Sequence, residues 1–97
     1  MKLRLSCRAE RDIEDIRSYL IARSPQGADR VRVSLSAAFD LLELFPYSGR
    51  ATSLDQIRVL PIVRYPYLIY YAVITDAIVI VHVRHASRDA PRTTDVT

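Results

Sequence analysis

The sequence has little cysteine and little glycine, and each shortage excludes a class of protein. Cys7 is its one cysteine, so no disulfide can form within the chain, whereas small domains in oxidising compartments usually carry several. We therefore expect a cytoplasmic protein. The two glycines, at positions 27 and 49, cannot build a glycine-rich loop around a phosphate, which excludes the common nucleotide-binding motifs.

Long hydrophobic runs are also lacking. The most apolar segment, residues 67–83, is interrupted by Thr75 and Asp76 and is shorter than the ~20 residues that cross a bilayer. Near the N-terminus, charged residues stand where a signal peptide needs an apolar stretch: Arg8, Glu10, Arg11 and Asp12. The sequence therefore predicts no membrane segment.

The composition is that of a globular domain. The chain has 97 residues, of which 49% are hydrophobic and 26% are charged, and this length suits a single core. The net charge is +3, and of the 14 basic residues only Lys2 is a lysine. Arginine pairs bidentately with carboxylates and phosphates, so the composition permits a polyanionic partner, but the small net charge does not require one.

The apolar pattern first predicts a short strand and two helices. Residues 2–5 alternate with a period of two, as a strand does, and Ser6 suits the N-cap of a following helix. Ser24-Pro25 is a typical start for a second helix, which Pro46 ends. Two apolar stripes at helical spacing mark these helices: Ala9, Ile13, Ile16 and Leu20 in the first, and Ala28, Val31, Leu35, Ala38, Leu42 and Phe45 in the second.

After a loop at residues 47–53, the apolar period changes from 3.6 to two. Residues 57–63 are expected to form a strand, with Pro61 at an edge or bulge position. Segments 67–74 and 77–84 are expected to form a hairpin. The predicted fold class is α+β, with the order β-α-α-β-β-β and a helical hairpin packed on a mainly antiparallel sheet. We expect one domain over residues 1–89 and a frayed tail over 90–97.

The last predicted strand carries the residues that could perform chemistry. By strict alternation, Ile80, His82 and Arg84 would share one face of this strand, whereas Val83 and His85 would share the other. A ribonuclease needs protonatable and cationic groups, because histidine can move protons and arginine can stabilise developing negative charge. One rim of the sheet could gather such groups: Arg58, Arg64, His82, Arg84, His85 and Arg88.

These residues also have a simpler interpretation, which we favour: they are hydrated strand ends, free to pair with Asp76, Asp89 or Glu43. No metal or other cofactor is expected, since one cysteine and two histidines are too few ligands and the histidines, three apart along a strand, point to opposite faces. Four tyrosines lie within residues 65–71. We expect them to pack within strands rather than to stack on bases.

Short strings along the chain form an ordered set over residues 2–89: Ala9 to Ile13, Ile16, Tyr19, Ala28, Leu35, Leu42, Pro46, Gly49-Arg50, Arg58 to Leu60, Tyr67 to Tyr71, Ile78 to Val83 and Arg84 to Asp89. This set resembles the ParE/RelE toxin superfamily of bacterial type II toxin–antitoxin modules. The resemblance implies a helical hairpin on a mainly antiparallel sheet, and a cognate antitoxin whose C-terminal segment wraps the toxin and neutralises it. RelE-type members cut messenger RNA on the ribosome, whereas ParE-type members poison DNA gyrase and have no known hydrolytic centre.

The residues at the matching positions favour the ParE branch. Where RelE-like nucleases have a pair of lysines, this chain has Arg58 and Leu60. Leu68 stands in place of one of their arginines, and Thr94 in place of their terminal tyrosine. Their arginine after the last strand is matched by Arg88. Leucine can neither donate a proton nor neutralise a phosphate. The net charge of +3 is also small for a protein that binds ribosomal RNA.

The resulting prediction is a toxin that inhibits DNA gyrase by contact and is neutralised by an antitoxin. The alternative is a ribosome-dependent endoribonuclease that uses Arg58, His85 and Arg88; a nuclease subtype with a C-terminal histidine-tyrosine pair fits less well, because Ala86 follows His85. A third reading is a toxin fold kept only as an antitoxin partner. Whether the chain binds nucleic acid directly is left open.

The resemblance also suggests which residues meet each partner. We expect the target to contact Arg84, His85 and Arg88. The antitoxin is expected to dock as an amphipathic helix in an exposed groove over Leu41, Leu44 and the helix stripes, with an added strand as a further mode. Its predicted contacts are Leu41, Leu44, Arg58 and Arg64.

Overall fold

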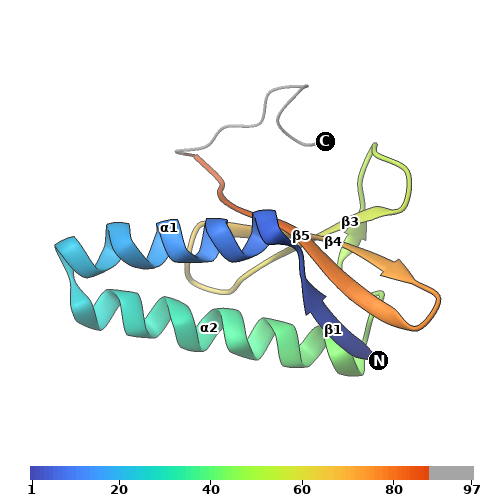
Figure 1. Cartoon of the computed structure of the whole chain (residues 1–97), viewed down its shortest axis with the longest axis horizontal. Coiled ribbons are helices and arrows are strands. Elements are labelled where there is room, and N and C mark those ends of the chain that lie inside the picture. The colour runs from blue at the N-terminus through green and yellow to red at the C-terminus, as the bar shows by residue number, and fades with distance from the viewer. Residues whose placement is uncertain (88–97) are drawn as a thin grey trace.

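The computed structural model describes residues 1–87 of the chain. The helices form a hairpin that packs on a five-stranded sheet (Figure 1). The strand order is β1-β5-β4-β3-β2, with β1 parallel to β5 and the other neighbours antiparallel. The predicted α+β fold is confirmed. The elements are β1 (Lys2–Leu5), α1 (Cys7–Arg23), α2 (Pro25–Leu44), β2 (Arg50–Ala51), β3 (Ile57–Pro61), β4 (Tyr67–Ile74) and β5 (Ala77–His85).

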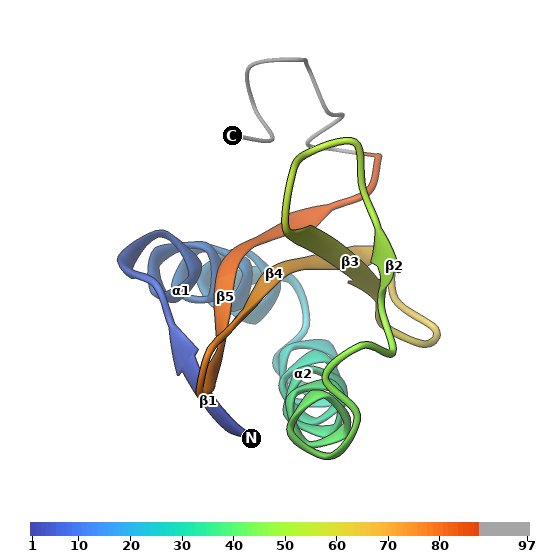
Figure 2. The same cartoon turned by 90° about the vertical axis from the view of Figure 1, so that its right-hand side faces the viewer.

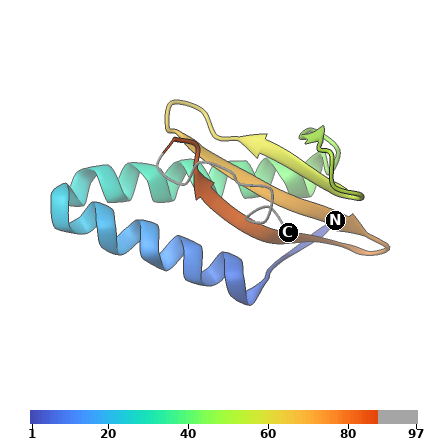
Figure 3. The same ribbon diagram turned by 90° about the horizontal axis from the view of Figure 1, so that it is seen from above.

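The sheet has one strand more than the sequence predicts. β2 consists of two residues inside a segment predicted as a loop, and two residues are too few to display a period of two. β3 ends at Pro61, two residues earlier than expected. The N-terminus and the β4–β5 turn lie at the same end of the molecule, and the α1–α2 turn lies at the other (Figure 3). Residues 90–97, expected to fray, lie outside the described residues.

Two serine caps fix where the helices begin: Ser6 at the start of α1, and Ser24 between α1 and α2. The Ser6 hydroxyl accepts a hydrogen bond from the Ala9 N–H at 3.0 Å, which begins α1 where predicted. Ser24 serves both helices: its N–H donates to the Leu20 carbonyl at 2.6 Å, and its hydroxyl accepts from the Gly27 N–H at 3.0 Å. One residue therefore ends α1 and begins α2, which folds the helices into a hairpin.

One apolar core lies between the helices and one face of the sheet (Figure 2). Of the predicted α2 stripe, Val31, Leu35, Ala38 and Leu42 belong to this core or pack against it. Ala28 is half-buried outside the core, and Phe45, one residue after the end of α2, is 61% exposed. In α1 only Ala9 is buried, so the rest of its apolar stripe is partly open. The buried core residues include Ala9, Val31, Leu35, Leu42, Ile69, Tyr71, Ile78, Ile80 and Val83.

β5 contains one residue more than the part of β4 opposite it. Tyr71 pairs with Ile80, and Tyr70 pairs with His82, so Val81 is left without a partner in a β-bulge. A bulge exchanges the faces of all residues that follow it. Strict alternation therefore fails in β5 beyond Ile80.

The bulge overturns one expectation about the faces of β5. Val83 lies opposite Ile69 and joins the core, whereas Arg84 lies opposite Leu68 on the other side of the sheet. The prediction that His82 and Arg84 share a face with Ile80 is therefore wrong. We call the sheet face that carries Leu68, Tyr70, His82 and Arg84 the outer face.

The start of α1 covers the edge of β5 where β1 ends. β1 pairs with β5 only as far as Ile80. Beyond this point the Ser6 N–H donates to the Ile80 carbonyl at 2.9 Å, the Ser6 hydroxyl donates to the Val81 carbonyl at 3.1 Å, and the Val83 N–H donates to Asp12 Oδ2 at 3.0 Å. These bonds satisfy a strand edge that would otherwise be open to other chains, and they attach α1 to the sheet.

Gly49 joins the end of α2 to the sheet by a close backbone approach. Its N–H donates to the Tyr71 hydroxyl at 2.8 Å, and its carbonyl accepts from Arg58 Nε at 2.9 Å. A Cβ at this position would lie 2.6 Å from the Tyr71 hydroxyl oxygen and 2.8 Å from the Val59 carbonyl oxygen. Only glycine fits this position without moving its neighbours.

The bond between Gly49 and Tyr71 gives a first prediction. Tyr71→Phe should lower the free energy of unfolding by about 1–3 kcal/mol, because the buried Gly49 N–H loses its acceptor. Tyr47→Phe is the matched control at a tyrosine that is 65% exposed, and it should change stability by less than about 0.5 kcal/mol. Urea denaturation measures both. Equal stability of Tyr71→Phe and the wild type would show that Gly49 does not need this hydroxyl.

Candidate functional site

The candidate site lies at the end of β5 that is remote from the β4–β5 turn. The Ala86 N–H donates to the Pro66 carbonyl at 2.7 Å, which ties the end of β5 to the β3–β4 connection. Arg64 lies exposed in that connection, with a positive φ of 76°. The structure thus places Arg64, Arg84 and His85 at one end of the sheet. Arg88 lies outside the described residues.

His82 is held by a carboxylate from α1. Its Nδ1 lies 2.5 Å from Asp12 Oδ2, which also accepts the Val83 N–H, while Asp12 Oδ1 accepts from Arg8 Nε at 3.2 Å. The side chains of His82 and Asp12 are 14% and 13% exposed, and the Tyr70 ring stacks on the imidazole. A carboxylate oxygen accepts hydrogen bonds, so the contact suits an imidazole that carries a proton on Nδ1.

The favoured interpretation from the sequence, that the polar residues of β5 are hydrated, is wrong for His82 and Arg84. His82 pairs with Asp12 and not with Asp76, which is exposed in the β4–β5 turn, and Arg84 is only 2% exposed. Sequence reasoning misses Asp12 because 70 residues separate it from His82. Its place on the polar side of an amphipathic helix is that of an ordinary solvated carboxylate.

Arg84 is buried, and the described residues offer two of its nitrogens no partner. Its side chain lies opposite Leu68 on the outer face, two residues after His82. Within residues 1–87, its Nε and Nη1 are the buried side-chain nitrogens that lack a hydrogen-bond partner. Buried charges are normally paired, so this guanidinium is a candidate binding group.

His85 has a different environment from His82. Its Nδ1 accepts from the Ser87 N–H at 3.1 Å, so the neutral ring carries its proton on Nε2. Its ring meets the Tyr67 ring edge-on, with centroids 5.3 Å apart. His85 lies opposite Tyr67 of the core face and His82 opposite Tyr70 of the outer face, so the two imidazoles are on opposite sides of the sheet.

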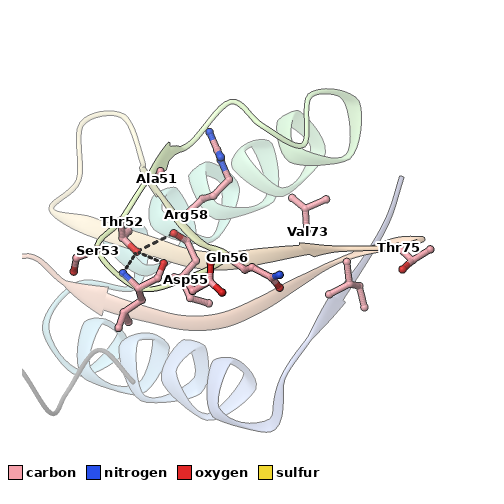
Figure 4. A pocket seen from close by; sticks show the side chains of 11 residues that line it. Ala51, Thr52, Ser53, Asp55, Gln56, Arg58, Val73 and Thr75 are labelled. Carbon is pink, nitrogen blue, oxygen red and sulfur yellow. Dashed lines mark hydrogen bonds between the residues drawn. The ribbon is translucent and has the colours of Figure 1, made fainter.

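Arg58 lies further along the sheet. Arg58 pairs with Tyr71 of β4, whereas His85 pairs with Tyr67 of the same strand. Tyr67 and Tyr71 are roughly 13 Å apart along β4 at the rise of a strand. The Nε of Arg58 is bonded to the Gly49 carbonyl, and Figure 4 shows its side chain directed away from Asp55. The structure does not bring Arg58 together with His85.

Two hollows lie away from the candidate site. One, of about 600 Å³, runs between α1 and α2, and its lining is mostly apolar. The other lies between the β2–β3 connection and the β4–β5 turn (Figure 4), where the Thr52 hydroxyl donates to the Ile57 carbonyl at 2.8 Å. The apolar side chains of the first, which we call the helix groove, include Ile13, Ile16, Leu20, Ile21, Val31 and Leu35.

Leu41 and Leu44, predicted to bind an antitoxin, lie near the end of α2. Their exposed fractions are 40% and 74%, and they do not line the helix groove. Exposed Phe45 and Tyr47 follow them. In the part of the chain that the structure describes, no three potential metal ligands gather, and no helix there is long and apolar enough to span a membrane.

Comparison with known proteins decides the family. Residues 3–90 match the model of the ParE toxin of the type II toxin–antitoxin system parDE. The chain belongs to the ParE toxin family. It is 32% identical over 91 residues to Y4kP of Sinorhizobium fredii, a protein assigned as a toxin, with 94% of each chain covered. It is 37% identical over 83 residues to toxin RelE2 of Caulobacter vibrioides, with 84% of this chain and 90% of that one covered.

A solved structure shares the fold of this ParE-family chain. The match is to the chromosomal ParDE toxin–antitoxin system of P. aeruginosa, with a TM-score of 0.80 and 19% sequence identity, over 88% of this chain and 95% of that one. The chain is therefore a toxin of a type II toxin–antitoxin module, within the ParE/RelE superfamily. Membership of the family implies a cognate antitoxin as its partner.

The carboxylate of Asp12 gives the second prediction. Asp12→Ala should lower the free energy of unfolding of the toxin by about 1–3 kcal/mol, because the Val83 N–H and His82 Nδ1 lose their acceptor. Asp15→Ala removes an exposed carboxylate from the same helix and should cost less than about 0.5 kcal/mol. Thermal and urea denaturation compare the two. Equal losses would show that Asp12 does not fasten α1 to β5.

Proposed function

We propose that this ParE-family toxin acts by binding DNA gyrase rather than by cutting RNA, and that its antitoxin neutralises it in the cytoplasm. The observation that carries the proposal is the separation of Arg58 from His85. Cleavage of RNA needs an acid, a base and a cation within reach of one phosphate. Arg58 is bonded to the Gly49 carbonyl and lies roughly 13 Å along the sheet from His85 at the rise of a strand.

The positions matched to basic residues of RelE-like nucleases support the same choice. Leu60 packs against the core, where a cation would be costly. Leu68 is half-buried on the outer face and brings no charge. A net charge of +3 also gives little attraction to ribosomal RNA. A toxin with these surfaces acts by contact, through the predicted target residues Arg84, His85 and Arg88.

The direct test adds the purified toxin to DNA gyrase and relaxed plasmid. We expect loss of supercoiling, or trapped cleaved plasmid, at micromolar toxin, and recovery when an equal amount of antitoxin is added. His85→Ala should weaken inhibition about 10-fold if the side chain contacts the target, whereas Arg30→Ala, at an exposed position of α2, should not. Full gyrase activity with micromolar toxin would contradict the proposal.

The match to a toxin named RelE2 motivates the alternative, a ribosome-dependent endoribonuclease. Primer extension on messenger RNA from induced cells distinguishes the two. Codon-phased cuts that disappear with Arg58→Gln would favour the nuclease. Induction without any effect on growth would instead favour a fold kept only as an antitoxin partner.

The helix groove is the surface best suited to an antitoxin helix. Its apolar lining fits the nonpolar side of an amphipathic helix. Arg17 and Arg32 also line it, paired with Glu14 and Asp29. Leu41, Leu44, Arg58 and Arg64 stay predicted contacts outside the groove.

Antitoxin docking gives a further prediction. Ile21 is 40% exposed and lines the helix groove, whereas Val33 is 51% exposed and does not. Ile21→Glu should weaken antitoxin binding at least about 10-fold, while Val33→Glu leaves it unchanged. Leu44→Glu tests the predicted contact at the end of α2 in the same titration calorimetry. Equal affinities for the wild type and Ile21→Glu would exclude the groove.

A further inference from the structure

The guanidinium of Arg84 finds no anion in the described part of the chain. Asp12, the carboxylate that reaches His82 beside it, is already occupied: Oδ2 holds His82 and the Val83 N–H, and Oδ1 holds Arg8. Nε and Nη1 of Arg84 are buried and have no hydrogen-bond partner within residues 1–87. Within residues 1–87, nothing therefore compensates the positive charge of this side chain.

Such a charge works against the stability of the isolated toxin. Arginine cannot lose its proton in a protein, so burial cannot be relieved by neutralisation. An uncompensated buried charge destabilises the folded state, and an apolar residue of similar volume is often more stable at such a position. The arrangement is accounted for if an anion from beyond the described residues completes it.

The surroundings of Arg84 favour a carboxylate from a protein over a nucleic acid. Leu68 lies opposite it, and Tyr70 and Val59 are buried alongside on the outer face. Nucleic acids are bound by several cations spread along an exposed surface, whereas His82 here is held by Asp12. A single desolvated arginine among apolar and aromatic side chains is typical of the centre of a protein interface.

We propose that Arg84 binds one carboxylate side chain of the antitoxin on the outer face of the sheet. The planar guanidinium suits a bidentate carboxylate. Because Arg84 is 2% exposed, the carboxylate reaches it when side chains of the outer face move aside, as interface side chains commonly do. The inference rests on the proposed neutralisation by an antitoxin. It adds a mechanism of neutralisation: an antitoxin carboxylate bound to Arg84 prevents this predicted target residue from contacting the target.

Two measurements on Arg84→Met test this proposal. The melting temperature of the free full-length toxin should rise by about 4 °C or more, because the uncompensated charge is removed. The Kd for the antitoxin encoded beside the toxin gene should increase about 10- to 100-fold, because a charge-assisted pair is lost. Arg30→Met removes an exposed charge from α2 and should change neither quantity.

Arg84→Lys keeps the charge and loses the planar geometry. It should leave the melting temperature within about 2 °C of the wild type and weaken antitoxin binding at least about 5-fold, so it reports on the interface even if Arg84→Met does not fold. Alanine substitutions of acidic antitoxin residues, combined with Arg84→Met in double-mutant cycles, should identify one residue whose loss has no further effect once Arg84 is replaced.

The outcomes that overturn the proposal are distinct. A lower melting temperature for Arg84→Met, with unchanged affinity for the antitoxin, would make Arg84 a structural residue. Unchanged antitoxin affinity with weaker binding of a short single-stranded RNA or DNA would assign the site to phosphate. If both Arg84 variants bind the antitoxin as tightly as the wild type does, only this inference fails. If the wild type itself does not bind the antitoxin, the proposed function fails as well.

Discussion

Val81 has no partner in β4, because Tyr71 pairs with Ile80 and Tyr70 with His82. This one extra residue turns Val83 into the core and turns Arg84 to the outer face. Strict alternation would instead direct a guanidinium into the apolar layer beneath the helices, at a large cost in desolvation. The bulge therefore sets the packing of β5 and the position of the candidate site together.

The elements with long apolar patterns could be predicted from the sequence. Both helices carry stripes at helical spacing, serines mark their starts, and the hairpin of β4 and β5 is rich in β-branched and aromatic residues. β2 could not be predicted, since two residues show no period. The bulge also has no local signal, because Val81 stands in a continuous run of apolar residues, 77–81, in which alternation distinguishes no face.

The candidate site could be predicted only as a set of polar residues at the end of an apolar strand. Their partners depend on contacts between distant segments: Asp12 meets His82 across 70 residues, and the register of β3, β4 and β5 keeps Arg58 away from His85. The bulge places Arg84 on the outer face, and its burial there has no signal in the sequence. A count of the charged residues gives the number of cations in the chain. It does not identify Arg84 as the one that is buried without an anion among the described residues.

In the described residues, this ParE-family toxin combines a helical hairpin bonded to the edge of β5 with a buried cation near the end of β5 that has no partner there. A crystal structure of the toxin with its antitoxin tests most directly whether that cation is completed by the partner. It should show an antitoxin carboxylate oxygen within about 3 Å of Arg84 Nε or Nη1, on the outer face beside Tyr70. An Arg84 that stays unpaired in the complex, or that pairs within its own chain, would contradict this interpretation.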